Sequence, residues 1–230
     1  MKKEITLVLE PDNGKLTAEV SGISNAEMAM LHDDLGGSHN VNCGKPLQKV
    51  VSEQSDYPID ATSADDSQSI WLYRIYHNSV VDGPGRRIVI QVAGCSIRCP
   101  GCYVPETHNR QNGRLVRVPS IVEEIKQNIN EHDGVTILGG EPFDQPGPVA
   151  EIVYQLRRLG IHITVYSGNT IATLLKQGNA NIHYILTHID LLIDGPFIQS
   201  LTRNAGEYRG SQNQRLIFDP RPDNISSVQQ

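Results

Sequence analysis

Apolar residues fall at alternate positions over residues 5–10 and return over residues 16–20. Alternation of this kind puts one face of a β-strand toward a core. Asn13-Gly14 lies between the two stretches and is a strong hairpin signal, so they are predicted to pair. A helical pattern follows over residues 26–35, with apolar side chains along one stripe. The first 43 residues are therefore predicted to form a small ββα appendage.

Residues 44–70 lose this periodicity and are rich in small, polar and acidic residues. Such a composition is typical of a linker, because it offers too little apolar surface for a core. We therefore expect a domain boundary here, a main domain over residues 71–220, and a flexible tail over residues 221–230.

From Trp71 onward, short β-branched runs alternate with amphipathic stretches at helical spacing. Beyond an apolar segment over 71–76, strands are predicted at 87–92, 134–138, 161–166, 191–195 and 215–218, and helices at 121–130, 148–159, 170–176 and 182–189, the first capped by Pro119-Ser120. Residues between the first of these strands and about Arg117 are expected to form a loop. The alternation is typical of a parallel α/β sheet, either open or partly closed into a barrel.

Unusual residues follow several of these predicted strands. A cysteine cluster follows the first, and the others are followed by Gly139-Gly140-Glu141, Ser167-Gly168 and Asp194-Gly195. The carboxyl ends of parallel strands meet at one edge of the sheet, where ligands bind. We therefore expect these four features to converge on one site.

The composition of the chain narrows the classes of protein to which it is expected to belong. The chain has 230 residues, 38% of them hydrophobic, and a net charge of −6. A broad surface for tracking nucleic-acid phosphates is not expected from that charge. No apolar run is long enough to span a bilayer, and the first residues do not resemble a signal peptide. We expect a cytoplasmic protein without a membrane or nucleic-acid partner.

Three of the four cysteines occur as Cys95-x3-Cys99-x2-Cys102. Thiolates are soft ligands that select zinc or iron–sulfur clusters, and this spacing is not a disulfide framework. Structural zinc needs a fourth ligand, for which His108 and Cys43 are the candidates. We favour an iron–sulfur cluster with one iron free of protein thiolate, and interpret Cys43 as an ordinary thiol.

The other features have simple alternatives. Gly139 and Gly140 alone suit a strand-to-loop turn, but glycine also permits close approach of a ligand to the main chain. Glu141 then offers a carboxylate to an ammonium group. Asp194-Gly195-Pro196-Phe197 alone also reads as a turn, and the amide-rich run over residues 209–214 suggests hydrogen bonding to backbone or ligand.

Together these motifs resemble the radical S-adenosylmethionine superfamily. Within it, the chain resembles the group of anaerobic ribonucleotide reductase activating proteins and pyruvate formate-lyase activating enzymes. The resemblance covers about residues 71–218. It is carried by the cysteine motif, Gly139-Gly140-Glu141-Pro142, Asp82-Gly83-Pro84-Gly85, Asp194-Gly195-Pro196-Phe197 and Arg209-Gly210-Ser211-x-Asn213-Gln214.

The resemblance implies a compact partial (β/α) barrel with a 4Fe–4S cluster on Cys95, Cys99 and Cys102 and S-adenosylmethionine on its open iron. It implies reductive cleavage of that cofactor to a 5′-deoxyadenosyl radical, which generates a glycyl radical on a partner enzyme. A flavodoxin or ferredoxin would supply the electron. The implied cofactor contacts are Gly139, Gly140 and Glu141 at the methionine part, the segment from Gly101 to Tyr103 near the adenine, Ser167 at the ribose, and Asp194 at its strand end.

Two other functions stay open from the sequence. A radical enzyme of this type is also consistent with modification of another peptide or a small molecule. A protein of a different class, a non-catalytic electron-transfer or binding module, would carry the cluster without cleaving the cofactor.

Overall fold

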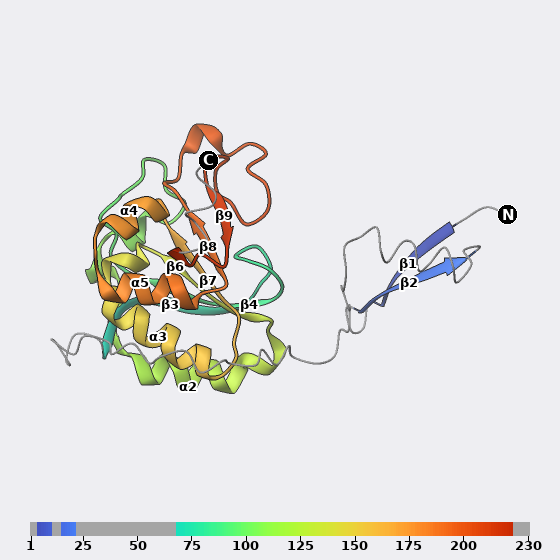
Figure 1. Cartoon of the computed structure of the whole chain (residues 1–230), viewed down its shortest axis with the longest axis horizontal. Coiled ribbons are helices and arrows are strands. Elements are labelled where there is room, and N and C mark those ends of the chain that lie inside the picture. Colours follow the sequence, from blue (N-terminus) through green and yellow to red (C-terminus); the bar gives the residue numbers. More distant parts are fainter. Residues whose placement is uncertain (1–3, 11–14, 22–67, 223–230) are drawn as a thin grey trace. The chain divides into compact units, whose positions relative to one another are not determined.

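The computed structural model describes residues 4–10, 15–21 and 68–222, with side chains over the last of these ranges (Figure 1). The chain contacts divide into two compact units, residues 1–48 and 49–230. The predicted helix at 26–35, Cys43 and most of the predicted linker lie outside the described residues. The predicted domain limits therefore stay a prediction.

The predicted N-terminal hairpin strands are present. Strand β1 (Glu4–Glu10) pairs antiparallel with β2 (Lys15–Ser21), and Glu10 lies opposite Lys15. The predicted turn at Asn13-Gly14 lies outside the described residues.

The main unit is built on a seven-stranded sheet in the order β5-β3-β4-β6-β7-β8-β9. The strands are β3 (Ser69–Ser79), β4 (Arg87–Val92), β5 (Arg114–Arg117), β6 (Gly134–Gly139), β7 (Ile163–Ser167), β8 (Leu191–Asp194) and β9 (Arg215–Phe218). The predicted α/β class is confirmed, and the four central strands β4, β6, β7 and β8 are parallel.

The expectation of a parallel sheet was wrong for the strand predicted at 215–218, and two further strands are also antiparallel. β3 runs antiparallel to both β4 and β5, and β9 runs antiparallel to β8. β5 lies within the stretch predicted to be a loop. It has four residues, three of them exposed, so its sequence carries no buried alternation and only its pairing with β3 makes it a strand.

Four α-helices lie on one side of this sheet (Figure 1). They are α2 (Val118–Asn128), α3 (Pro146–Arg158), α4 (Ile171–Lys176) and α5 (Ala180–His188). Short 3-10 helices lie in the connections between elements: η1 (Pro105–His108), η2 (Arg110–Asn112), η3 (Ile129–Glu131), η4 (Pro142–Asp144) and η5 (Gln199–Leu201). Alternate strand residues such as Ile88, Ile90 and Val92 pack with the helices in one core. The predicted cap at Pro119-Ser120 is wrong, because the helix begins at Val118 and Arg117 is its N-cap.

The opposite side of the sheet carries several polar residues among apolar ones such as Val89, Leu191 and Ile193. Strand alternation puts Arg87, Gln91, Thr136, Thr164 and Tyr166 on that side, away from the helices. All but Tyr166 are buried. The polar residues of this face leave hydrogen-bonding groups on the side where the cavity described below opens, which Gln91 and Tyr166 line.

Arg87 connects neighbouring strands on this face through hydrogen bonds. Its guanidinium donates to Thr136 Oγ1 at 3.1 Å, to Thr164 Oγ1 at 3.2 Å, and to the carbonyl oxygens of Pro84, Val135 and His162. The side chain is fully buried, and burial lowers its pKa to about 10. One side chain therefore joins three parallel strands and the turn before β4.

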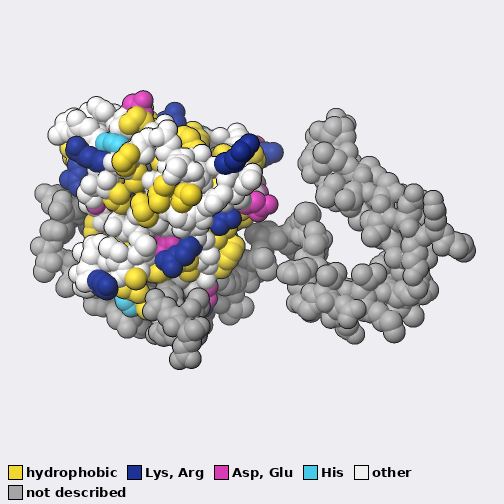
Figure 2. Space-filling view, turned by 90° about the horizontal axis from the view of Figure 1, so that it is seen from above, with side chains coloured by type: hydrophobic (Ala, Val, Ile, Leu, Met, Phe, Trp, Pro, Cys, Tyr) yellow, Lys and Arg dark blue, Asp and Glu magenta, His cyan; other side chains and the backbone are white. Residues whose placement is uncertain are grey.

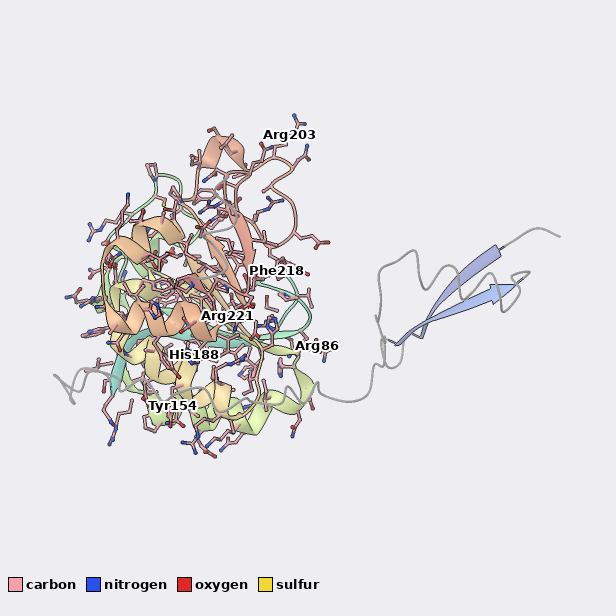
Figure 3. All side chains as sticks on the ribbon, viewed as in Figure 1. Arg86, Tyr154, His188, Arg203, Phe218 and Arg221 are labelled. Atoms are coloured by element: carbon pink, nitrogen blue, oxygen red, sulfur yellow. The ribbon has the colours of Figure 1, made fainter. Side chains whose placement is uncertain are left out.

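Arg87→Met is expected to lower the free energy of unfolding by about 3 kcal/mol or more, because it leaves several buried acceptors without a donor. The neighbouring Arg86 is exposed and lies at the surface (Figure 3), so Arg86→Met is the matched control, with a change within about 0.5 kcal/mol. Urea unfolding of both variants measures the difference. Equal stabilities would contradict the role assigned to Arg87.

The surface gives two further observations. On the face in Figure 2, basic and acidic side chains are interspersed among hydrophobic ones, rather than gathered into one basic track. Within the ranges that the structure describes, none of the helices combines the length and the apolar run needed to cross a bilayer.

Candidate functional site

A cavity of about 740 Å³ opens at the carboxyl ends of the central strands. Eight of the ten residues predicted to form the site line it: Cys95, Cys99, Cys102, Tyr103, Gly139, Gly140, Glu141 and Ser167. Gly101 and Asp194 are not part of its lining. The predicted convergence on one edge of the sheet therefore holds for the cysteine loop, the Gly-Gly-Glu segment and the end of β7.

The start of the cysteine loop is held in place by the segment that follows the loop in the chain. Gly94 N–H donates to the carbonyl of Thr107 at 2.7 Å, and Cys95 N–H donates to the carbonyl of His108 at 3.2 Å. Ser96 is fixed from the other side, since its N–H and hydroxyl donate to the Asp144 carboxylate at 2.6 and 2.8 Å. The loop is thus anchored at its first three residues, 94–96, from two directions.

Gly101 has a local structural reason to be glycine. Its φ is +74°, a left-handed conformation that favours glycine. A Cβ there would lie 2.5 Å from Oε1 of Gln199. This glycine shapes the turn between Cys99 and Cys102, whose ends are joined by a hydrogen bond from Cys102 N–H to the Cys99 carbonyl.

The donor chemistry of this loop fits an iron–sulfur cluster. All three cysteines are free thiols, half-buried, on one cavity wall. Burial raises the pKa of the Cys95 thiol, so this sulfur stays protonated until a metal replaces the proton. Within residues 68–222, no three His, Cys, Asp or Glu side chains are already arranged around a common point for a metal ion. The fit therefore rests on the soft donor set and the shared cavity.

The Gly-Gly-Glu segment is fastened directly to the cysteine loop. Gly140 N–H donates to the carbonyl of Val92 at 2.9 Å, and Glu141 N–H donates to the carbonyl of Gly94 at 2.8 Å. A Cβ on Gly140 would lie 2.0 Å from the Gly94 carbonyl oxygen, which is too close for any side chain. Glycine at 140 is therefore required for the two loops to lie against each other.

Gly140→Ala is expected to separate the two loops and to lower the free energy of unfolding by about 2–4 kcal/mol, as for other severe overpacking. Gly160→Ala is the matched control, because nothing lies within 4 Å of the added methyl group. Its positive φ adds only about 1 kcal/mol of backbone strain. Thermal unfolding and iron content after reconstitution measure both variants, and a Gly140→Ala protein that loads iron normally would contradict this view.

Glu141 and Ser167 meet in the cavity wall. The Glu141 carboxylate accepts from Phe143 N–H at 3.0 Å, from the Ser167 hydroxyl at 3.0 Å and from Gly168 N–H at 2.9 Å. The side chain is fully buried, and burial raises its pKa to about 7 despite these donors. Since a carboxylate has about four acceptor positions, three donors leave one for a ligand.

The buried Glu141 is expected to make stability fall as pH rises. Between its ordinary pKa of 4.5 and its folded value of about 7, the folded state binds the proton more tightly than the unfolded state. This contribution to stability is complete below pH 4.5 and is lost as pH rises through about 7, a change of about 3 kcal/mol. Urea unfolding of the wild type and Glu141→Gln across this range isolates it, because other carboxylates titrate alike in both. A constant difference between the two proteins would contradict the raised pKa.

Asp194 has a structural role. Its buried carboxylate pairs with Arg215 at 2.5 Å and accepts from Ile171 N–H at 2.7 Å, at the start of α4. It has the same strand parity as Leu192, which packs in the helix-side core. Parity alone does not settle the side, since Ser167 has the parity of Val165 in the same core and still lines the cavity.

The amide-rich run over residues 209–214 bonds to backbone. Gln214 accepts from the N–H groups of Gly210 and Ser211 and donates to the carbonyl of Gly195. The run therefore fixes the loop that forms the far wall of the cavity.

The structure adds cavity residues that sequence reasoning did not assign to the site. They are Val80, Val81, Tyr166, Phe197, Glu207 and Tyr208, together with Asp82, His108 and Arg209, which were noticed in other roles. The ring of Phe197 lies 4.8 Å from that of Tyr103, which joins the far wall to the cysteine loop. His108 Nε2 and Arg209 Nε are buried without a hydrogen-bond partner. The sequence signalled one of these residues, Tyr166. Residues alternate between the two faces of a strand, so Tyr166 on β7 points away from the side of the core residue Val165.

Known proteins are similar to this chain in sequence. The family described as a 4Fe-4S single cluster domain matches residues 81–217, which is more than half of the chain. The chain belongs to this family. The predicted iron–sulfur cofactor is thereby confirmed for this 4Fe-4S domain.

Two relatives in this family are anaerobic ribonucleoside-triphosphate reductase-activating proteins. The one from Vibrio cholerae is 30% identical over 150 residues, covering 62% of this chain and 94% of the relative. The one from Haemophilus influenzae is 32% identical over 147 residues, covering 60% and 92%. The pyruvate formate-lyase-activating enzyme of Clostridium pasteurianum is 29% identical over 126 residues, or 53% of this chain and 50% of that enzyme.

These relatives confirm the predicted placement of the 4Fe-4S domain in the radical S-adenosylmethionine activase group, and with it S-adenosylmethionine as the second cofactor. The match begins at residue 81, so it includes the Asp82-Gly85 turn and leaves the N-terminal 80 residues outside.

Proposed function

We propose that this protein is a radical S-adenosylmethionine activase that generates a glycyl radical on a partner enzyme. The observation that supports this most directly is the hydrogen-bonded union of the cysteine loop with Gly140 and Glu141 in the wall of one cavity. The names of the relatives point to an anaerobic ribonucleoside-triphosphate reductase as the kind of partner. When bound, the cluster and the cofactor supply one-electron cleavage of the cofactor's carbon–sulfur bond and the radical that abstracts hydrogen.

The chain's own residues bind and orient the two cofactors in this proposal. Cys95, Cys99 and Cys102 hold the cluster as thiolates. Glu141 attracts the cofactor's ammonium group with its remaining acceptor position, while the glycines at 139 and 140 let the methionine part lie against the main chain.

Two residues take roles that follow from their surroundings. Tyr103 is 69% exposed at the cavity rim beside Phe197, and we assign this aromatic pair to the adenine side. Ser167, which was expected at the ribose, already donates to Glu141 and accepts from Asn169 N–H at 3.0 Å. We therefore assign Ser167 to orienting the Glu141 carboxylate.

The fold and the cellular compartment that we propose for the protein are consistent with these roles. Four parallel strands with the described helices on one side are consistent with a partial (β/α) barrel, and we propose that architecture. A reducing compartment keeps the thiols available, so we propose the cytoplasm, with a flavodoxin or ferredoxin as electron donor.

Anaerobic reconstitution with iron and sulfide, followed by dithionite and S-adenosylmethionine, tests the chemistry. We expect 5′-deoxyadenosine and methionine in equal amounts. Product no higher than in Cys102→Ala, or a purified protein with one zinc and no brown absorption, would contradict the proposal.

The partner is tested by electron paramagnetic resonance. A glycyl-radical signal is expected in an anaerobic ribonucleoside-triphosphate reductase incubated with the loaded protein. Formation of 5′-deoxyadenosine without such a signal in any glycyl-radical enzyme of the same organism would favour modification of another peptide or a small molecule. A reducible cluster without 5′-deoxyadenosine would favour the electron-transfer module.

A further inference from the structure

We propose that His108 donates a hydrogen bond from Nε2 to a sulfur of the bound iron–sulfur cluster and thereby raises the cluster's reduction potential. This inference rests on the proposed function, since it requires the cluster on the cysteine loop. It assigns a role to a residue outside the cysteine motif and the Gly-Gly-Glu segment.

The backbone brings His108 next to the first cysteine. His108 ends η1, six residues after Cys102, and its carbonyl accepts the N–H of Cys95 at 3.2 Å. The preceding Thr107 is fully buried, and its carbonyl accepts the N–H of Gly94 at 2.7 Å. The position of His108 relative to Cys95 is therefore fixed by main-chain hydrogen bonds and not by side-chain packing alone.

His108 belongs to the wall of the cavity that the three cysteines line. Its Nε2 is buried without any hydrogen-bond partner. A buried polar atom left unpaired costs about 1–3 kcal/mol, so such atoms usually have a partner supplied by a ligand or an ordered water. Within the described part of the chain, no protein group serves Nε2.

The proposed iron–sulfur cluster is a suitable hydrogen-bond acceptor for Nε2 of His108. A cluster on three thiolates presents sulfide and thiolate sulfurs, which accept hydrogen bonds and offer no donor. A neutral imidazole carrying its proton on Nε2 is the complementary group. Donation to sulfur stabilises the more negative, reduced cluster, and hydrogen bonds to the sulfurs are one of the features that set the potential of such clusters.

The experiment compares reduction potentials of the reconstituted protein. His108→Phe fills the volume of the ring without a donor, His108→Gln restores an N–H donor, and His183→Phe replaces an exposed histidine on α5 as the matched control. Each protein is titrated with dithionite, which supplies the single electron, and the reduced cluster is counted by electron paramagnetic resonance. Iron, sulfide and absorption of the wild type are measured first.

We expect His108→Phe to bind a full cluster whose one-electron reduction equilibrium is about tenfold less favourable, a shift of 59 mV to lower potential. His108→Gln should lie between it and the wild type, and His183→Phe should match the wild type. An unchanged potential in His108→Phe would overturn the inference.

Two further results separate the possible failures. Loss of iron from both His108→Phe and His108→Gln, in proteins with wild-type thermal unfolding, would overturn the inference by making His108 a ligand. If His108→Phe does not fold, a wild-type potential in His108→Ala would overturn it equally. A wild type without any iron–sulfur absorption would instead contradict the proposed function itself.

Discussion

Replacing any one of Cys95, Cys99 or Cys102 with alanine is expected to abolish formation of 5′-deoxyadenosine and to remove most of the iron–sulfur absorption. Three thiolates are the whole protein ligand set in the proposed site, so none can be lost without opening a second iron to solvent. All three line the same cavity, and the start of their loop donates backbone hydrogen bonds to the carbonyls of Thr107 and His108. Iron and sulfide analysis, visible absorption and product quantification measure the effect after anaerobic reconstitution.

Cys43→Ala is the control for this series. Cys43 lies outside the described residues and outside the family match, and we interpret it as an ordinary thiol. Its variant should keep the full cluster and full product formation. If Cys43→Ala also lost the cluster, the assignment of three ligands from the loop alone would be wrong.

Glu141→Gln is expected to weaken binding of S-adenosylmethionine by about 10- to 100-fold, because a hydrogen bond to a charged group contributes about 1.5–3 kcal/mol. The amide keeps the shape of the side chain but loses the negative charge that attracts the ammonium group. Since burial raises the pKa of Glu141 to about 7, the wild-type affinity should also fall as pH drops below 7. Anaerobic calorimetric titration of the cluster-loaded proteins measures both effects.

Glu207→Gln is the matched control, because Glu207 lines the same cavity but is exposed. Its affinity for the cofactor should stay within about twofold of the wild type, a change of about 0.4 kcal/mol. Equal losses in the two variants would mean that the cavity acts through its overall charge, and not through the carboxylate at position 141.

Most of the main unit was predictable because its elements carry their own patterns. The strands at 87–92 and 215–218 were found at their observed bounds, and the helices at 148–159 and 170–176 within two residues. Each has apolar spacing that a single strand or helix imposes locally. β5 had no such pattern, because an exposed edge strand gains its hydrogen bonds from a neighbour distant in sequence.

Part of the candidate site was likewise predictable from the sequence, and part depended on the tertiary structure. The cysteine motif and Gly139-Gly140-Glu141 were identified from residue chemistry and from their position after predicted strands. Asp194 was assigned to the site with them, yet its carboxylate is used by Arg215 and by the start of α4. A strand end alone does not say on which side of the sheet a side chain lies, and that side depends on register.

The sequence by itself determined the donor chemistry, the α/β class and the order of the chemical motifs, because each depends on residue identity or local spacing. Only the tertiary structure decided which strands run antiparallel, how Gly140 and Glu141 bond to the cysteine loop, and that His108 lines the same cavity with its Nε2 buried. These depend on contacts between residues far apart in the chain, which close only when the sheet brings its strand ends to one edge.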